Sequence, residues 1–147
     1  MNPGTAGLLR VLLADDDEDD RVFFRDALQE IPLATSLNAV KDGDELMNLL
    51  HHEGLIHDLL FLDLNMPGRN GKECLQEIRM FSHLKKMPVI IFSTSANHRD
   101  VEEAFSLGAD LYLQKPSGYS LMVQQLEKVL TIDWNLFYRD RQRFLFT

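Results

Sequence analysis

Short apolar runs separated by more polar segments are the first regularity of this chain. The strongest runs cover residues 8–14, 59–64, 88–93 and 109–114, and a weaker run covers residues 35–40. None of the four strong runs alternates cleanly between apolar and polar positions, as a strand with one face in water would. Continuous apolar runs of this length are typical of strands buried on both faces, as in a parallel sheet.

Helical patterns fill the gaps between these runs. Apolar side chains recur there mainly at intervals of three and four residues, in five sets: Val22, Phe23, Ala27, Leu28 and Ile31; Leu46, Leu49 and Leu50; Cys74, Leu75, Ile78 and Phe81; Val101, Ala104 and Phe105; and Leu121, Val123, Leu126, Val129 and Leu130. Pro32 follows the first set, and Gly43 and Gly54 flank the second, where helix boundaries are expected. Strand and helix alternate five times, which predicts one α/β domain, residues 8–130, with helices on both faces of a parallel sheet.

Composition and charge narrow the class of protein. The 147 residues carry a formal net charge of −8, and no basic patch precedes the C-terminal tail, so a nucleic-acid partner is not expected. The single cysteine, Cys74, excludes an intramolecular disulfide and favours a cytoplasmic location. The N-terminus shows no signal-peptide pattern and the chain has no apolar run of about 18 residues, so no membrane association is expected.

The first apolar run leads directly into six consecutive acidic residues, 15–20. For residues 17–20 we favour the start of a helix, where the helix dipole stabilises a carboxylate by about 0.3–1 kcal/mol. Asp15 and Asp16 lie where the first strand ends, and Asp63 lies where the third strand ends. If these strands are neighbours, the three carboxylates meet at one edge of the sheet and repel one another. A hard divalent cation such as Mg²⁺ would relieve that repulsion.

Other polar side chains are expected at the same edge. Ser93 and Thr94 end the fourth strand, and Lys115 ends the fifth. Each residue is commonplace alone, but acids, a hydroxyl and a lysine at successive strand ends of one domain form a fairly specific pattern. Ligands of open parallel sheets bind at this edge.

These residues are where the chain resembles the receiver domain of bacterial two-component response regulators. The matching segments are LLADDDEDDR, LFLDLNMPGRNG, IIFSTS and GADLYLQKP, in the same order and with similar spacing, over about residues 8–130. The resemblance implies a flavodoxin-like, doubly wound (βα)5 fold with a five-stranded parallel sheet in the order 2-1-3-4-5.

The resemblance also implies roles for the acidic residues. Asp63 is similar to the phosphoacceptor, which takes a phosphoryl group from a histidine kinase. Asp16 is similar to the direct Mg²⁺ ligand, and Asp15 to the acid that acts mainly through coordinated water. Asn65 would offer its backbone carbonyl to the same ion, for which Mn²⁺ is an alternative.

Four further residues are implied to bind the phosphoryl group or to respond to it: Ser93, Thr94, Lys115 and Tyr112. Ser93 and Lys115 would contact phosphoryl oxygens, and Thr94 stands where a smaller residue is often found. Tyr112 resembles the aromatic residue whose orientation follows the Ser93 hydroxyl, although an ordinary strand tyrosine with an exposed hydroxyl is an equal alternative. The Lys115–Pro116 bond is often cis in the family, so a cis bond is expected here.

The function that we predict is a stand-alone, non-enzymatic response regulator that signals through protein contacts or passes the phosphoryl group on in a relay. Its partner would be a sensor histidine kinase or a histidine phosphotransfer protein. One alternative is a phosphate-independent scaffold with a vestigial pocket. Another is a phosphatase of the haloacid dehalogenase type, disfavoured because Asn65 stands where a second aspartate would be needed.

Residues 131–147 form a C-terminal arm rich in aromatic residues and arginine, a composition typical of interfaces. The arm is too short for a helix-turn-helix output domain. Two alternatives stay open: the arm folds back over its own domain, or it docks on another subunit or on the kinase. A homodimer through residues 110–147 is one form of the second alternative. The arm loosely resembles the C-terminal arms of small regulators linked to phytochromes and other sensor kinases.

Overall fold

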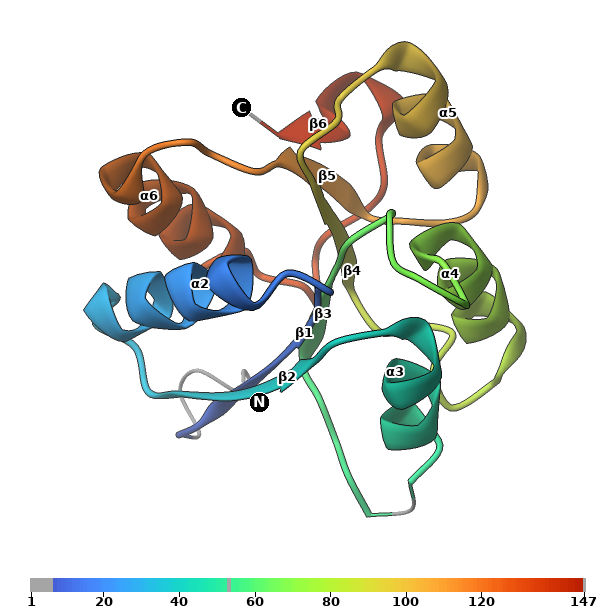
Figure 1. The fold of residues 1–147 in the computed structure, drawn as a ribbon, viewed down its shortest axis with the longest axis horizontal. Coiled ribbons are helices and arrows are strands. Elements are labelled where there is room, and N and C mark those ends of the chain that lie inside the picture. The colour runs from blue at the N-terminus through green and yellow to red at the C-terminus, as the bar shows by residue number, and fades with distance from the viewer. Residues whose placement is uncertain (1–6, 53, 147) are drawn as a thin grey trace.

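The fold is seen in a computed structural model that describes residues 7–52 and 54–146 of the chain. The element labels are those of Figure 1, in which the first helix is α2. The strands are β1 (Leu9–Ala14), β2 (Thr35–Val40), β3 (Leu59–Leu62), β4 (Val89–Ser93), β5 (Leu111–Gln114) and β6 (Leu145–Phe146). The helices are α2 (Glu18–Glu30), α3 (Gly43–Leu50), α4 (Gly71–Met80), α5 (His98–Ser106) and α6 (Tyr119–Leu130), with a short 3₁₀ helix, η1 (Arg141–Arg143), before β6.

The six strands form one sheet in the order β2-β1-β3-β4-β5-β6, and every neighbouring pair is parallel. The first five strands confirm the doubly wound, flavodoxin-like order expected from the resemblance. The predicted apolar runs extend slightly beyond the strands, since the run over 109–114 narrows to Leu111–Gln114. The sixth strand was not predicted.

Helices cover both faces of the sheet (Figure 1). Helices α2 and α6 lie on one face, and α3, α4 and α5 lie on the other. Alternate residues of each central strand enter the two cores: in β3, Leu60 and Leu62 face α3 and α4, whereas Leu59 and Phe61 face α2 and α6. Burial on both faces explains why the strands read as continuous apolar runs.

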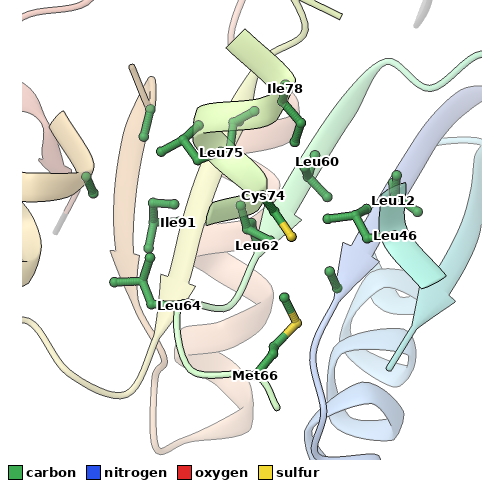
Figure 2. Close-up of a cluster of buried hydrophobic side chains, with 14 of the residues drawn as sticks. Leu12, Leu46, Leu60, Leu62, Leu64, Met66, Cys74, Leu75, Ile78 and Ile91 are labelled. Atoms are coloured by element: carbon green, nitrogen blue, oxygen red, sulfur yellow. The ribbon is translucent and has the colours of Figure 1, made fainter. Parts of the chain in front are cut away.

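Figure 2 shows the core beneath α3 and α4, where Leu46, Leu75 and Ile78 meet side chains of the strands. Cys74 lies in this core and is fully buried. Burial raises the pKa of its thiol to about 11, so the thiol stays protonated and behaves as a small apolar side chain.

Side-chain caps begin four of the helices. Asp17, Asp42, Asn70 and Asn97 each accept a hydrogen bond from the backbone N–H three residues later, which satisfies a donor that the helix cannot pair itself. Asn70 and Glu73 complete a reciprocal capping box at α4. The acidic run after β1 therefore serves partly as a helix start, as predicted.

Among the described residues, no helix is long and apolar enough to span a membrane.

The C-terminal arm folds back over its own domain. Its last strand, β6, pairs with β5 at the edge of the sheet, and Phe144 is fully buried against Phe105 and Tyr112. Arg141 pairs with Glu102 of α5. Of the two alternatives for the arm, the structure shows the first, while the outer side of the arm remains exposed.

Candidate functional site

Backbone hydrogen bonds between neighbouring strands place the predicted site residues at one edge of the sheet. The N–H of Asp15 donates to Val40 at the end of β2, and the N–H of Asp63 donates to Ala14 at the end of β1, at 3.0 Å in each case. The N–H of Lys115 donates to the carbonyl of Ser93 at 2.7 Å. These bonds continue the sheet one residue past the strands, so the side chains are positioned by the strand order.

The three predicted acids come together at this edge. One carboxylate oxygen from each of Asp15, Asp16 and Asp63 lies within 4.8 Å of the others. Asp15 and Asp63 are buried, whereas Asp16 is exposed. Backbone N–H groups hold the two buried carboxylates, because Asp17 donates to Asp15 Oδ1 at 3.0 Å and Asn65 donates to Asp63 Oδ1 at 3.2 Å.

Lys115 reaches into this cluster, as predicted from its place after β5. Its Nζ lies 2.8 Å from Asp15 Oδ2 and 3.4 Å from Asp63 Oδ2. Asp15 Oδ2 is buried, so the ammonium of Lys115 is its close charged neighbour in the site. A third carboxylate, Asp20, lies 2.8 Å from the same Nζ.

The electrostatics of the site follow from burial and from these close charges. Burial raises the pKa of Asp63 to about 6; Lys115 opposes the shift and Asp15 adds to it. Burial also raises the pKa of Asp15. Burial lowers the pKa of Lys115, but the contacts with Asp15 and Asp20 raise it by more, so its pKa lies above the ordinary value and the lysine is charged at neutral pH. One ammonium therefore faces several carboxylates, which leaves the site with excess negative charge.

The residues at the ends of β4 and β5 differ in their surroundings. Ser93 is fully buried, and its hydroxyl has no hydrogen-bond partner among the described residues. Thr94 is exposed at the rim. Tyr112 is fully buried, and its hydroxyl donates to the carbonyl of Ser95 at 2.6 Å. The alternative of a strand tyrosine with an exposed hydroxyl is therefore wrong.

The expectation of a cis Lys115–Pro116 bond is also wrong, because no peptide bond among the described residues is cis.

Two residues of the site were missed at the sequence level. Asp20 was assigned to the helix start alone, although it lies three and four residues before Phe23 and Phe24, on the side of α2 that faces the domain. Gly71 packs against the backbone of Asp63 and Leu64 so closely that a Cβ there would collide with both. Helical spacing was a usable signal for Asp20, whereas nothing in the local sequence indicates the packing of Gly71.

An open parallel sheet with charged groups gathered at its carboxyl edge defines a doubly wound α/β protein that binds ligands at that edge. Residues 11–127 match the family model of the response regulator receiver domain. The chain is 32% identical over 125 residues to the response regulator Rcp1 of Synechocystis sp.. The aligned region covers 80% of this chain and 85% of Rcp1. It is 27% identical over 121 residues to the chemotaxis protein CheY of Pseudomonas aeruginosa, covering 82% of this chain and 95% of CheY.

Solved structures agree with these relatives. The Mn²⁺-bound form of Rcp1 aligns with a TM-score of 0.76 at 26% identity, over 90% of this chain and 99% of that one. The phosphorylated cyanobacterial phytochrome response regulator RcpA aligns with a TM-score of 0.77 at 29% identity, over 84% of this chain and 91% of that one. The chain therefore belongs to the response regulator receiver domain family.

The donor set of the site suits a divalent metal ion. Carboxylate oxygens are the ligands that hard divalent cations prefer, and three carboxylates converge here. Lys115 supplies only one positive charge against these carboxylates, so a divalent cation would balance the remaining negative charge.

Proposed function

We propose that this chain is a single-domain response regulator that accepts a phosphoryl group on Asp63 from a sensor histidine kinase or a histidine phosphotransfer protein. The observation that carries the proposal is the environment of Asp63, a buried carboxylate 3.4 Å from a lysine ammonium and beside two further acids. This set matches the needs of phosphoryl transfer, which depends mainly on positioning and on neutralising charge.

In the proposed reaction, a carboxylate oxygen of Asp63 attacks the phosphorus atom of a phosphohistidine. A P–O bond forms while the P–N bond breaks, and its electron pair returns to the imidazole nitrogen, which takes a proton. Lys115 pairs with one phosphoryl oxygen, and the unpartnered Ser93 hydroxyl donates a hydrogen bond to another. The aspartyl phosphate adds negative charge and strong acceptors at one point of the edge.

We propose that the divalent ion is Mg²⁺, for which Mn²⁺ can substitute. Asp16, Asp63 and the backbone carbonyl of Asn65 would hold it directly, and Asp15 would act mainly through coordinated water. When bound, the ion would neutralise carboxylate and phosphoryl oxygens during transfer. Mg²⁺ suits a site with few carboxylates because it keeps several waters.

We further propose that phosphorylation is read at β5 and α5. Ser93 and Thr94 stand at the end of β4, which pairs with β5, and the hydroxyl of Tyr112 in β5 donates to the carbonyl of Ser95 in the β4–α5 segment. Movement of the Ser93 hydroxyl toward the phosphoryl group would change the packing around Tyr112 and so bias a two-state surface.

Residues 8–130 act in this proposal as the receiver unit, and residues 131–147 as an arm that covers the β5 edge. We propose a homodimer through residues 110–147, for which the exposed side of the arm is available. We place the protein in the cytoplasm and limit its own chemistry to phosphorylation and dephosphorylation of Asp63. We propose no nucleic-acid or membrane partner for this function.

Intact mass measurement tests the phosphorylation directly. Wild-type protein incubated with Mg²⁺ and acetyl phosphate is expected to gain one phosphoryl group. Asp63→Asn is expected to gain none, because the amide is not a nucleophile, and EDTA is expected to abolish the gain in the wild type.

A cognate kinase provides the second donor for this test. If the wild type gains no phosphoryl group from acetyl phosphate or from the kinase, the proposal fails and the phosphate-independent scaffold is favoured. Labelling of Asp63→Asn to the same extent as the wild type would contradict the assignment of Asp63.

A further inference from the structure

We propose that Asp20 is a positioning residue that competes with the phosphoryl group for Lys115 and so weakens phosphoryl binding at Asp63. The inference rests on the proposed function, since it concerns how the same site is tuned. Asp20 does not belong to the group of three acids that could hold a metal ion.

The distances place Lys115 nearer to Asp20 than to the phosphoacceptor. Nζ of Lys115 donates a hydrogen bond to Asp20 Oδ2 at 2.8 Å and a longer one to Asp63 Oδ2 at 3.4 Å. An ammonium has three N–H donors, and here three carboxylates surround it: Asp15, Asp20 and Asp63. A phosphoryl oxygen that approaches Lys115 must therefore displace one of the three.

Asp20 is the partner that Lys115 can release most easily. The side chain of Asp15 is 1% exposed, so in the metal-free site it would lose its counter-ion without gaining water. With the proposed metal ion bound, Asp15 faces that ion, and Asp20 is the acid outside the metal group that still holds Lys115. Asp63 carries the phosphoryl group and stays in place. The side chain of Asp20 is 39% exposed, so water can replace the ammonium when Lys115 turns toward a phosphoryl oxygen.

The fold directs Asp20 to this contact. Asp20 is the third residue of α2, and its backbone N–H is capped by Asp17 Oδ1 at 3.0 Å. It lies on the helix face that continues through Phe24 and Ala27 into the core, so its side chain points toward the sheet edge. Asp19, one residue earlier, carries the same charge on the exposed face of the same turn.

Two effects then act in the same direction. The carboxylate of Asp20 holds the ammonium that a phosphoryl oxygen needs, and its own negative charge repels the incoming anion. Replacing Asp20 by asparagine keeps the shape and removes both effects. Replacing Asp19 by asparagine removes the same net charge at the helix start but leaves Lys115 paired as before.

Binding of beryllium fluoride in the presence of Mg²⁺ measures this competition, because the fluoride complex occupies the place of a phosphoryl group on an aspartate without a covalent reaction. Its dissociation constant is measured by calorimetry for the full-length wild type, Asp20→Asn, Asp20→Glu and Asp19→Asn. Asp20→Asn is expected to bind about five- to tenfold more tightly than the wild type, as expected for removing a competing charge at a partly exposed site. Asp19→Asn is expected to stay within about twofold of the wild type because its charge is more distant and screened.

Asp20→Glu serves as the rescue variant. It restores the competing carboxylate on a longer side chain, so its affinity should return to within about twofold of the wild type. A residue that acts only through the helix start would give the same result for Asp19→Asn and Asp20→Asn, because both remove one first-turn charge.

Equal affinities of Asp19→Asn and Asp20→Asn, or weaker binding by Asp20→Asn, would overturn the role of Asp20 while leaving the proposed function intact. Wild-type protein that neither binds the fluoride complex nor gains mass from a phosphodonor would overturn the proposed function, and this inference with it. The two failures are therefore distinguishable in one series of measurements.

Discussion

Asp63 shows how one side chain is altered by its surroundings. Its side chain is 7% exposed, and burial raises its pKa to about 6 against the partial compensation of Lys115. A carboxylate kept charged in such a place is costly to the folded state, and that cost is what a bound cation would relieve. The residue that we assign as nucleophile is therefore also a source of instability in the metal-free protein.

The first prediction at this scale concerns pH. Because the pKa of Asp63 is higher in the folded protein than the unperturbed value of 3.8, the folded state gains stability as the pH falls through about 6 and loses it as the pH rises. Metal-free wild type is expected to be more stable at pH 5.5 than at pH 7.5 in urea unfolding. Between pH 7.5 and pH 5.5 the expected gain is about 0.8 kcal/mol, because most of a shift of this size acts between about pH 4 and pH 6.

Asp63→Asn is the matched variant for this measurement. It should be more stable than the wild type at pH 7.5 and should lose much of the pH dependence, with the remainder due to Asp15, whose pKa burial also raises. An unchanged slope in Asp63→Asn would show that the instability arises elsewhere.

At the scale of elements, the arm is an added piece of the domain. Strand β6 extends the sheet, and the N–H of Tyr112 donates to the carbonyl of Phe144 at 2.9 Å. Arg139 stacks on Phe105 at 4.1 Å and donates to the carbonyls of Phe105 and Ala109. The arm therefore packs on the two elements, α5 and β5, that we propose to read the phosphorylation state.

Substitution of Phe144 tests whether the arm stays docked in solution. Phe144 is fully buried, so Phe144→Ala is expected to lower the free energy of unfolding by about 3–4 kcal/mol. Tyr138 of the same arm is 72% exposed, and Tyr138→Ala should change it by less than about 0.5 kcal/mol. Similar small effects for both variants in urea unfolding would mean that the arm is mostly undocked.

At the scale of the whole molecule, the sheet has two edges, β2 and β6, and the arm occupies the second. The arm leaves three large apolar side chains exposed on its outer side: Leu136, Tyr138 and Leu145. Leu136 and Tyr138 line one pocket of the arm, and exposed apolar groups that lie together are typical of interaction sites. The arm can therefore cover its own domain and still present a surface to a second copy.

Light scattering tests the homodimer proposed for residues 110–147. The wild type is expected to have the mass of a dimer, and the double variant Leu136→Glu, Tyr138→Glu the mass of a monomer, because charges would be buried at the interface. Met80→Glu is the control, since Met80 is as exposed as Leu136, at 78%, but lies at the end of α4. A monomeric wild type, or equal masses for all three proteins, would contradict the dimer.

The sequence by itself determined the features that depend on local chemistry. Continuous apolar runs predicted the strands, and the acidic residues 17–20 predicted where the first helix begins, because capping acts over three residues. The acids, hydroxyl and lysine at the strand ends could also be found in this way, since parallel strands place their carboxyl ends at one edge.

Only the tertiary structure decided the features that depend on distant neighbours. Asp20 and Lys115 meet across 95 positions of the chain, and Gly71 must pass close to Asp63, which no local pattern reports. The sequence of the arm is equally compatible with a free interface segment and with a segment docked on its own domain. The burial of Phe144 beside Tyr112 shows that the arm is docked. The pKa of Asp63 likewise follows from its burial and from the charges around it, both of which exist only once the strands have assembled.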